Sequence, residues 1–296
     1  MANTVISTKD LTKDYGKGRG AIDITFSVYP GEIVGFIGPN GAGKSTTMRL
    51  IMGYSAPDRG SVSLFDKTIH SERDLNSVIG DIGFFPSEGG LYEYLTPKEL
   101  FTYSSQLYGK NYNARALEMA EVIKLDVDKQ IKKLSFGNKK KTGLIYALMH
   151  SPKLVILDEP TAGLDPLIQQ EILKFLKGVR DQGGSVFLSS HVLAEVQSVC
   201  DRVIMIKDSK IILEDSTENI LRKAVNIITL QNPDPQVVEG LSALPVVKKT
   251  EQKGIEFMVY VEENKPVIDF LVRHNVYDFY LKKPSLENMF LEYYES

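Results

Sequence analysis

The chain has 296 residues, 43% hydrophobic and 25% charged, which is typical of a folded protein with one large domain and a smaller appended one. Its net charge of −3 excludes a nucleic-acid partner held by charge alone, because such binding needs clustered lysines and arginines. One cysteine, Cys200, excludes an internal disulfide and is typical of a reducing cytosol, and we expect it to be a small buried residue. We expect no leader peptide and no intrinsic membrane span, since no apolar run approaches the roughly 18 residues that a spanning helix needs.

Apolar runs typical of strands alternate with helical periodicity through the first two-thirds of the chain. The predicted strands are residues 4–11, 22–28, 32–37, 82–85, 153–158, 185–190 and 202–207. The predicted helices are residues 43–54, 137–149, 166–182 and 192–199. The strand at 153–158 has four consecutive apolar residues at its centre, which is typical of a strand buried on both faces of a parallel sheet. The predicted fold class is therefore α/β with a mostly parallel sheet.

Two regions depart from this alternation. Residues from about 97 to 150 form helices without a strand pattern, which predicts a helical subdomain inserted between two strands of the sheet. A boundary near Thr217 divides the chain into an expected first domain, 1–216, and an accessory α+β domain, 217–296.

The expected elements of this second domain follow the order β-α-β-β-α-β plus one helix, which resembles a ferredoxin-like module. Its predicted strands are residues 226–230, 246–250, 255–261 and 277–281, and its predicted helices follow Pro235, span 265–274 and begin at Ser285.

The most specific motif lies between the strand at 32–37 and the helix that follows. It matches G-x4-G-K-[ST] and consists of Gly38, Pro39, Asn40, Gly41, Ala42, Gly43, Lys44, Ser45 and Thr46. Its glycines let backbone N–H groups curl toward phosphate oxygens, and the helix N-terminus adds partial positive charge. Lys44 would neutralise β- and γ-phosphate oxygens, and the Ser45 hydroxyl would bind Mg²⁺. The strand-loop-helix context favours this interpretation over a glycine-rich turn with a solvated lysine.

Two carboxylates, Asp158 and Glu159, end the strand at 153–158. Asp158 would hold Mg²⁺ through water, and Glu159 would orient or deprotonate the attacking water. Adjacent acids at a strand end are common in turns, so the pair alone does not indicate a site. The interpretation rests on the pair occurring together with the phosphate-binding loop.

Further segments resemble the ATPase subunits of ABC transporters. Residues 134–138 (Leu-Ser-Phe-Gly-Asn) resemble the signature motif, residues 161–166 resemble the D-loop, and His191 after two serines resembles the switch histidine. Tyr15 lies where this family places an aromatic residue that stacks on adenine. The resemblance covers roughly residues 5–214 and implies the fold of ABC ATPases, which are P-loop NTPases.

The resemblance implies that two cassettes share each ATP. Ser135, Gly137 and Asn138 would contact the γ-phosphate bound by the opposite subunit, and Asp165 would communicate across the interface. His191 would hold the γ-phosphate in its own subunit, beside Lys44 and Glu159. The second cassette is either an identical chain or a sister ABC ATPase subunit.

The segment at 284–290 resembles the C-terminal extension of ATPase subunits from bacterial drug, peptide and polysaccharide exporters. This resemblance implies an exporter in which the chain sits on the cytoplasmic face of the cell membrane, bound to a transmembrane permease subunit. The transported substrate and the role of the second domain stay open.

Three positions depart from the family pattern. Ser87 replaces a glutamine that touches Mg²⁺ and the attacking water, Phe136 replaces a glycine of the signature, and Asn138 replaces a longer amide. A serine hydroxyl can still reach Mg²⁺ through a water, but its arm is shorter. Because Ser135 and Gly137 of the signature remain, we expect ATP binding across the interface to survive with altered geometry. The alternative function is an ABC-type ATPase with a non-transport or regulatory role and weak or no hydrolysis.

Two groups of side chains carry competing interpretations. Residues 139–141, all lysine, are expected to form a solvated face of the signature helix, with electrostatic help to phosphate as the second interpretation. An aromatic-rich stretch is interpreted either as the core of the helical subdomain or as a groove for a helix of the membrane subunit. It contains Phe84, Phe85, Tyr92, Tyr94, Phe101, Tyr103 and Tyr108.

Overall fold

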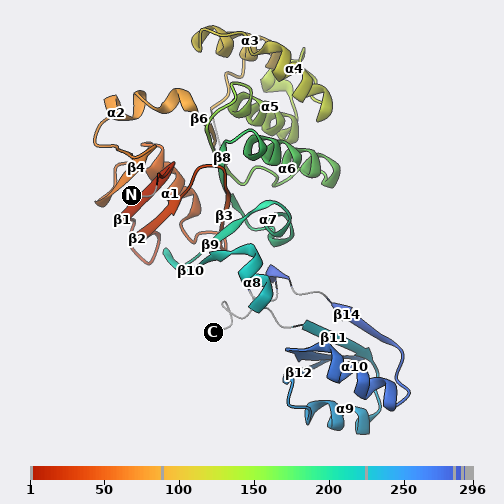
Figure 1. The fold of residues 1–296 in the computed structure, drawn as a ribbon. Coiled ribbons are helices and arrows are strands. Elements are labelled where there is room, and N and C mark those ends of the chain that lie inside the picture. The colour runs from red at the N-terminus through yellow and green to blue at the C-terminus, as the bar shows by residue number, and fades with distance from the viewer. Residues whose placement is uncertain (1–2, 88–89, 224–225, 283–284, 288–289, 291–296) are drawn as a thin grey trace. The chain divides into compact units, whose positions relative to one another are not determined.

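The computed structural model describes residues 3–87, 90–223, 226–282, 285–287 and 290. The chain forms two compact units, Met1–Ser216 and Thr217–Ser296 (Figure 1). Each unit has a hydrophobic core of its own. Among the described residues, none of the helices has the length and apolar character required to cross a membrane.

The central sheet of the first unit has six strands in the order β10-β9-β3-β8-β7-β6. The strands are β3 (Ile33–Ile37), β6 (Ile82–Phe85), β7 (Leu154–Asp158), β8 (Ser185–Ser190), β9 (Arg202–Lys207) and β10 (Lys210–Ser216). Neighbouring strands are parallel except for β9 and β10. Every residue of β3, β7 and β8 is buried, as expected for strands covered on both faces. The predicted α/β class with a mostly parallel sheet is confirmed.

Different elements cover the two faces of this sheet. One face carries α1 (Lys44–Ile51) and an antiparallel sheet in the order β2-β1-β4-β5. The strands of this second sheet are β1 (Ile6–Asp14), β2 (Gly20–Val28), β4 (Arg59–Leu64) and β5 (Lys67–Thr68). Phe26, Phe36 and Phe187 stack between the sheets with ring centroids 5.1 to 5.9 Å apart. On the opposite face α7 (Leu193–Val199) lies so close that a Cβ added at Gly35 would be 2.8 Å from Cγ1 of Val196.

Helices fill the chain between β6 and β7, and the described residues there contain no strand. They are α3 (Pro97–Leu107), α4 (Asn113–Val122), the 3-10 turn η2 (Ile131–Lys133) and α5 (Phe136–Leu148). Helix α3 begins with a capping box, in which the Thr96 side chain accepts from the Glu99 backbone N–H and the Glu99 carboxylate accepts from the Thr96 N–H. The remaining helices of the first unit are α2 (Glu72–Asn76), η1 (Ile79–Asp81) and α6 (Pro166–Asp181).

The second unit is a small α+β domain with an antiparallel sheet in the order β12-β13-β11-β14. Its elements are α8 (Thr217–Lys223), β11 (Asn226–Gln231), α9 (Pro235–Ser242), β12 (Val247–Lys253), β13 (Glu256–Val261), α10 (Asn264–Arg273) and β14 (Phe279–Lys282). Alternate residues of β13, namely Phe257, Val259 and Val261, pack against Val267 and Leu271 of α10. This topology agrees with the ferredoxin-like expectation.

Several short elements escape the sequence patterns. The strands β4, β5 and β10 and the helices α2 and α8 were not predicted. Strand β10 lies at the sheet edge, where its residues are half-buried or exposed. Its pairing with the neighbouring strand does not require a strongly apolar sequence, so no clear strand pattern is visible. A helix was expected to begin at Ser285. Leu286, Glu287 and Phe290 are helical, whereas Ser285 is not, and the other residues of this expected helix lie outside the described part of the chain.

Candidate functional site

The topology brings the predicted site together because the carboxyl ends of parallel strands meet at one edge of a sheet. The phosphate-binding loop follows β3, Ser87 follows β6, Asp158 and Glu159 lie at the end of β7, and His191 follows β8. Four segments that are distant in sequence therefore deliver polar side chains to one place.

The phosphate-binding loop depends on glycine where the chain is most crowded. Gly43 has φ of 109° and caps α1, and a Cβ added there would lie 2.1 Å from the carbonyl oxygen of Gly20. A Cβ at Gly38 would lie 2.3 Å from the carbonyl oxygen of Ile206. Backbone packing thus forbids side chains at both ends of the loop.

The Lys44 side chain is buried at the start of α1. Its Nζ donates to the carbonyl oxygens of Gly38 at 2.7 Å and Pro39 at 3.1 Å, and lies 3.6 Å from Oε1 of Glu159. Burial lowers the pKa of the Lys44 ammonium from its ordinary value, although the carboxylates of Glu159 and Asp158 oppose this shift. The Lys44 ammonium is shielded from water and bonded to carbonyl oxygens of its own phosphate-binding loop. Such a cation is well suited to bind phosphate oxygens.

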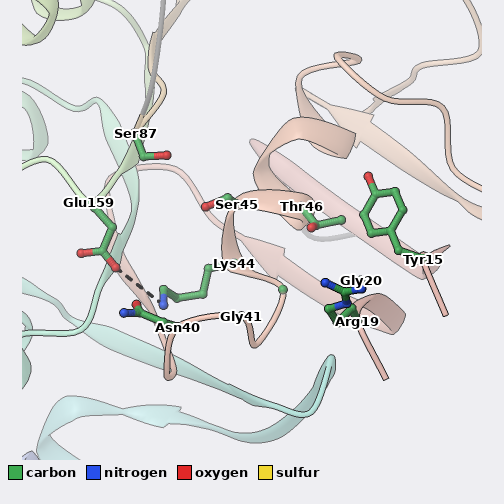
Figure 2. A pocket seen from close by; sticks show the side chains of 11 residues that line it. Tyr15, Arg19, Gly20, Asn40, Gly41, Lys44, Ser45, Thr46, Ser87 and Glu159 are labelled. Atoms are coloured by element: carbon green, nitrogen blue, oxygen red, sulfur yellow. Dashed lines mark ion pairs between the residues drawn. The ribbon is translucent and has the colours of Figure 1, made fainter. Parts of the chain in front are cut away.

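A cavity of about 320 Å³ lies over the loop. Figure 2 shows Lys44 and Glu159 pointing toward each other on one side of it, with Tyr15 and Arg19 on the other. The lining residues are Tyr15, Arg19, Gly20, Asn40, Gly41, Gly43, Lys44, Ser45, Thr46, Ser87 and Glu159. The sequence patterns missed Arg19 and Gly20, and the only available signal was the Gly-Lys-Gly-Arg-Gly run that follows Tyr15.

The acidic pair at the end of β7 is held by β8. Ser189 Oγ donates to Asp158 Oδ1 at 2.6 Å and accepts from the Glu159 backbone N–H at 2.9 Å. The Glu159 carboxylate also pairs with His191, whose Nδ1 lies 2.7 Å from Glu159 Oε2. Glu159 has φ of 52°, a left-handed conformation that costs a non-glycine residue roughly 1 kcal/mol or more. Such strain beside a phosphate-binding loop is a typical feature of functional sites.

The oxygen donors near the loop fit a magnesium ion. Hydroxyl and carboxylate oxygens are ligands that Mg²⁺ prefers, and Ser45, Ser87 and Asp158 supply them. The Asp158 carboxylate is buried and accepts a hydrogen bond from Ser189, so it is held in a fixed orientation. The described residues contain no group of three or more His, Cys, Asp and Glu side chains arranged to hold a metal by themselves.

The signature segment and Asp165 lie apart from this cavity. Ser135 caps α5 by accepting from the Asn138 backbone N–H at 3.4 Å, and Asp165 caps α6 by accepting from the Ile168 N–H at 3.1 Å. Phe136 is 65% exposed. Neither these residues nor Gly137 belong to the described residues that line the cavity. Gly38, Pro39, Ala42, Asp158 and His191 also lie outside its lining, although they adjoin residues that belong to it.

The lysines at 139–141 were expected to form a solvated face of α5, but two of the three are buried. Lys140 and Lys141 are buried, so that prediction is wrong for both, whereas Lys139 is partly exposed and pairs with Glu93 at 2.6 Å. Helix α5 packs against α3, α4 and β6, which places most of its circumference in the protein interior. Burial lowers the pKa of the Lys140 ammonium, and nearby Glu159 opposes this shift.

The aromatic-rich stretch contains both core residues and exposed ones. Phe85 and Phe101 are buried core residues, whereas Tyr92, Tyr94 and Tyr103 are exposed. The ring of Tyr92 contacts those of Tyr94 and Tyr103 edge-on, with centroids 6.1 and 5.7 Å apart. These three rings form an exposed tyrosine cluster on the helical region.

Comparison with known proteins identifies the family. The profile described as "ABC transporter" matches residues 22–162. The uncharacterized ABC transporter ATP-binding protein YhcH of Bacillus subtilis is 33% identical, over 98% of this chain and 95% of that protein. The Nod factor export ATP-binding protein I of Rhizobium etli is 29% identical, over 98% of this chain and 93% of that protein. The bacitracin transport ATP-binding protein BcrA of Bacillus licheniformis is 31% identical, over 78% of this chain and 76% of that protein.

Solved structures agree with the sequence relatives. An ATP-binding subunit of an ABC transporter matches with a TM-score of 0.68 and 30% identity, over 74% of this chain and 93% of that chain. The ABC transporter cassette MJ0796, solved as a dimer, matches with a TM-score of 0.64 and 24% identity, over 72% of this chain and 98% of that one, and supports the fold. YhcH matches nearly the whole length of this chain, which also carries the phosphate-binding loop motif and the acidic pair at the end of β7. The chain therefore belongs to the ATP-binding proteins of ABC transporters.

Proposed function

We propose that the chain hydrolyses Mg²⁺-ATP at the cavity over its phosphate-binding loop and thereby powers a separate membrane subunit that exports a substrate. The observation that carries this proposal is the convergence of Lys44 and Glu159 at the cavity, with their charged atoms 3.6 Å apart. A buried ammonium that faces phosphate and a carboxylate that faces water are the groups that phosphoryl transfer to water requires.

The roles of the residues follow from their positions. Lys44 would exchange its bonds to the Gly38 and Pro39 carbonyl oxygens for bonds to β- and γ-phosphate oxygens. Glu159 would accept a proton from the water that attacks the γ-phosphoryl group, and the bond from the γ-phosphorus to the ADP oxygen would break. His191 would hold Glu159 through Nδ1 and contact the γ-phosphate.

Ser45 would hold the magnesium ion through its hydroxyl, and Asp158 and Ser87 would act through water. When bound, Mg²⁺ would neutralise phosphate charge and orient the triphosphate. Tyr15, half exposed at the edge of the cavity, would stack on the adenine ring.

We infer that ATP is closed over by a second cassette, either a second copy or a sister chain. Ser135, Gly137, Asn138 and Asp165 lie outside the cavity of their own chain, which supports a role at a nucleotide held by another. Ser135 sits at the N-terminus of α5, where backbone N–H groups and the helix dipole favour an anion. The relative MJ0796 was solved as a dimer, which supports this arrangement.

The direction of transport rests on the relatives named for Nod factor export and bacitracin transport. The exposed tyrosine cluster of Tyr92, Tyr94 and Tyr103 would receive a cytoplasmic segment of the permease, since interfaces concentrate aromatic anchors. The chain would then work at the cytoplasmic face of the membrane. Its first domain, 1–216, would carry the ATPase, and 217–296 would be an accessory domain.

The decisive test is hydrolysis by the purified full chain and its Glu159→Gln variant. We expect the variant to bind ATP with wild-type affinity and to lose turnover by about 10²–10⁴-fold, because the amide cannot accept the proton. Equal rates for the two proteins would remove Glu159 from this role. An inactive wild-type chain, tested with and without its membrane partner, would instead favour the regulatory alternative.

A further inference from the structure

Lys140 of α5 is buried beneath the loop that follows Glu159. Its Nζ donates to the carbonyl oxygen of Glu159 at 2.5 Å and to that of Ala162 at 2.8 Å. The side chain is 7% exposed, so water cannot easily replace these bonds. Hydrogen bonds from a charged donor are among the stronger ones in proteins. Lys140, on the helix that begins with the signature segment, therefore holds the backbone of Glu159, the proposed general base.

Both backbone polar groups of Glu159 form hydrogen bonds with side chains. Its N–H donates to Ser189 Oγ at 2.9 Å, and its carbonyl oxygen accepts from Lys140. Between these two bonds the residue adopts its left-handed conformation, with φ of 52°. Since a non-glycine residue avoids this conformation unless its surroundings impose it, the bonds to Ser189 and Lys140 help to fix the backbone from which the Glu159 carboxylate extends toward His191 and Lys44.

Packing joins the same loop to the first turn of α5. A Cβ added at Gly163 would lie 3.2 Å from Cε1 of Phe136, and one added at Gly137 would lie 3.3 Å from Cδ2 of Leu164. The Lys140 ammonium also lies 5.8 Å from the centroid of the Phe136 ring. The start of α5 and residues 159–164 are therefore in direct contact and would move together.

We propose that Lys140 is a positioning residue that transmits movement of the signature helix to Glu159. When the N-terminus of α5 engages the nucleotide of the opposite cassette, Lys140 would pull on the Glu159 carbonyl and align its carboxylate with the attacking water of its own site. The two ATP sites of a pair would thus be coupled, with Lys140 as the link between α5 and the Glu159 carbonyl. This inference rests on the proposed role of Glu159 and goes beyond it.

The experiment compares Lys140→Met, Lys140→Arg and the matched control Lys139→Met in the full chain. Lys139 is the adjacent residue, but its ammonium pairs with Glu93 and not with the loop. We expect Lys140→Met to lower kcat about 10–100-fold, because small misplacements of a catalytic group have effects of this size. ATP affinity, measured with a fluorescent analogue, should change by less than about 2-fold, since Lys140 does not line the cavity. Lys140→Arg should recover most of the rate, and Lys139→Met should match the wild type.

A double variant separates positioning from a general structural effect. If Lys140 acts through Glu159, adding Lys140→Met to Glu159→Gln should not lower the residual single-turnover rate further, because groups that act as a unit are non-additive. Thermal melting checks that the variants are folded at the assay temperature. Lys140→Gln, which retains one donor group, would replace Lys140→Met if the latter melts too low.

Three outcomes would overturn the coupling: an unchanged kcat for Lys140→Met, a loss confined to ATP affinity, or an equal further loss in the Glu159→Gln background. The proposed function fails in a different way. Wild-type turnover by Glu159→Gln would remove Glu159 as general base, whereas a slow Glu159→Gln with unaffected Lys140 variants would remove the coupling alone.

Discussion

The cavity over the phosphate-binding loop and the signature segment belong to the same unit but differ in completeness. In the cavity, Lys44 and Glu159 come from different strand ends and already face each other. Ser135 and Asp165, by contrast, cap helices of their own chain and are exposed. One region is thus organised by buried contacts within the chain, whereas the other consists of exposed helix N-termini outside the cavity. This difference is what the proposed sharing of each ATP between two cassettes would require of a single chain.

The largest combined effect, on ATP binding and on turnover together, should come from the cavity over the phosphate-binding loop. Lys44→Ala removes the buried cation of the loop, and we expect hydrolysis to fall by about 10²–10³-fold, as for loss of a preorganised electrostatic group. ATP affinity should fall as well, because the same ammonium binds the ground-state phosphates. Phosphate release and nucleotide titration measure the two effects, with the exposed surface variant Lys153→Ala as control. Undiminished affinity and turnover would show that the loop does not bind triphosphate.

A mixing experiment tests the signature segment. Gly137→Asp places a negative charge in the signature segment, and we expect it to abolish turnover by the pure variant but to preserve ATP binding, because Gly137 lies outside the cavity. An equal mixture of Gly137→Asp and Lys44→Ala chains should recover about a quarter of the wild-type rate if the two sites act independently, since half of the pairs are mixed and each contains one complete site. Coupling through Lys140 would hold the recovery below that value, because the complete site then faces a site without ATP. No recovery, together with no ATP-dependent pairing of the mixed chains in size-exclusion chromatography, would mean that copies of this chain do not share sites.

The edge of the cavity should contribute less. Tyr15→Ala removes the exposed ring proposed to stack on adenine, and we expect KM for ATP to rise roughly 5–10-fold, in line with about 1 kcal/mol for an aromatic stacking contact. Tyr15→Phe keeps the ring and should behave like the wild type. If KM for the alanine variant stays unchanged, adenine is recognised elsewhere, and Arg19 becomes the first residue to test.

The smallest effect concerns stability at the junction of the two regions. Glu195 of α7 accepts from the Thr161 hydroxyl at 2.5 Å, and burial raises the pKa of its carboxyl. Because the pKa is higher in the folded state, the folded protein holds this proton more tightly, and its stabilising effect is lost as pH rises through that pKa. Glu195→Gln keeps an acceptor without the charge, so we expect the Tm near pH 7 to rise by about 1–3 °C. The difference should vanish below the ordinary carboxyl pKa, and melting curves across pH would contradict us if it persisted there.

Much of the site over the phosphate-binding loop could be predicted because its signals are local. The loop at 38–46 and the apolar strand before it are adjacent in sequence, and so are the strand at 153–158 and its two acids. The environment of Lys140 could not be predicted in this way. Three consecutive lysines indicate a solvated surface, but Lys140 finds its two carbonyl partners 19 and 22 residues further along the chain.

The sequence by itself determined the mostly parallel sheet and the positions of the glycine-rich loop and of Lys44, Asp158 and Glu159 at the strand ends, because periodicity and motif spacing encode them within a few residues. The roles proposed for these three side chains rest on the same local signals. Tertiary structure alone decided that Arg19 and Gly20 line the cavity, that Glu159 is held in a left-handed conformation, and that Lys140 and Glu195 are buried beside it. Burial and hydrogen bonding between distant segments depend on how α5 and α7 pack around the strand ends. No local pattern in the chain specifies that packing.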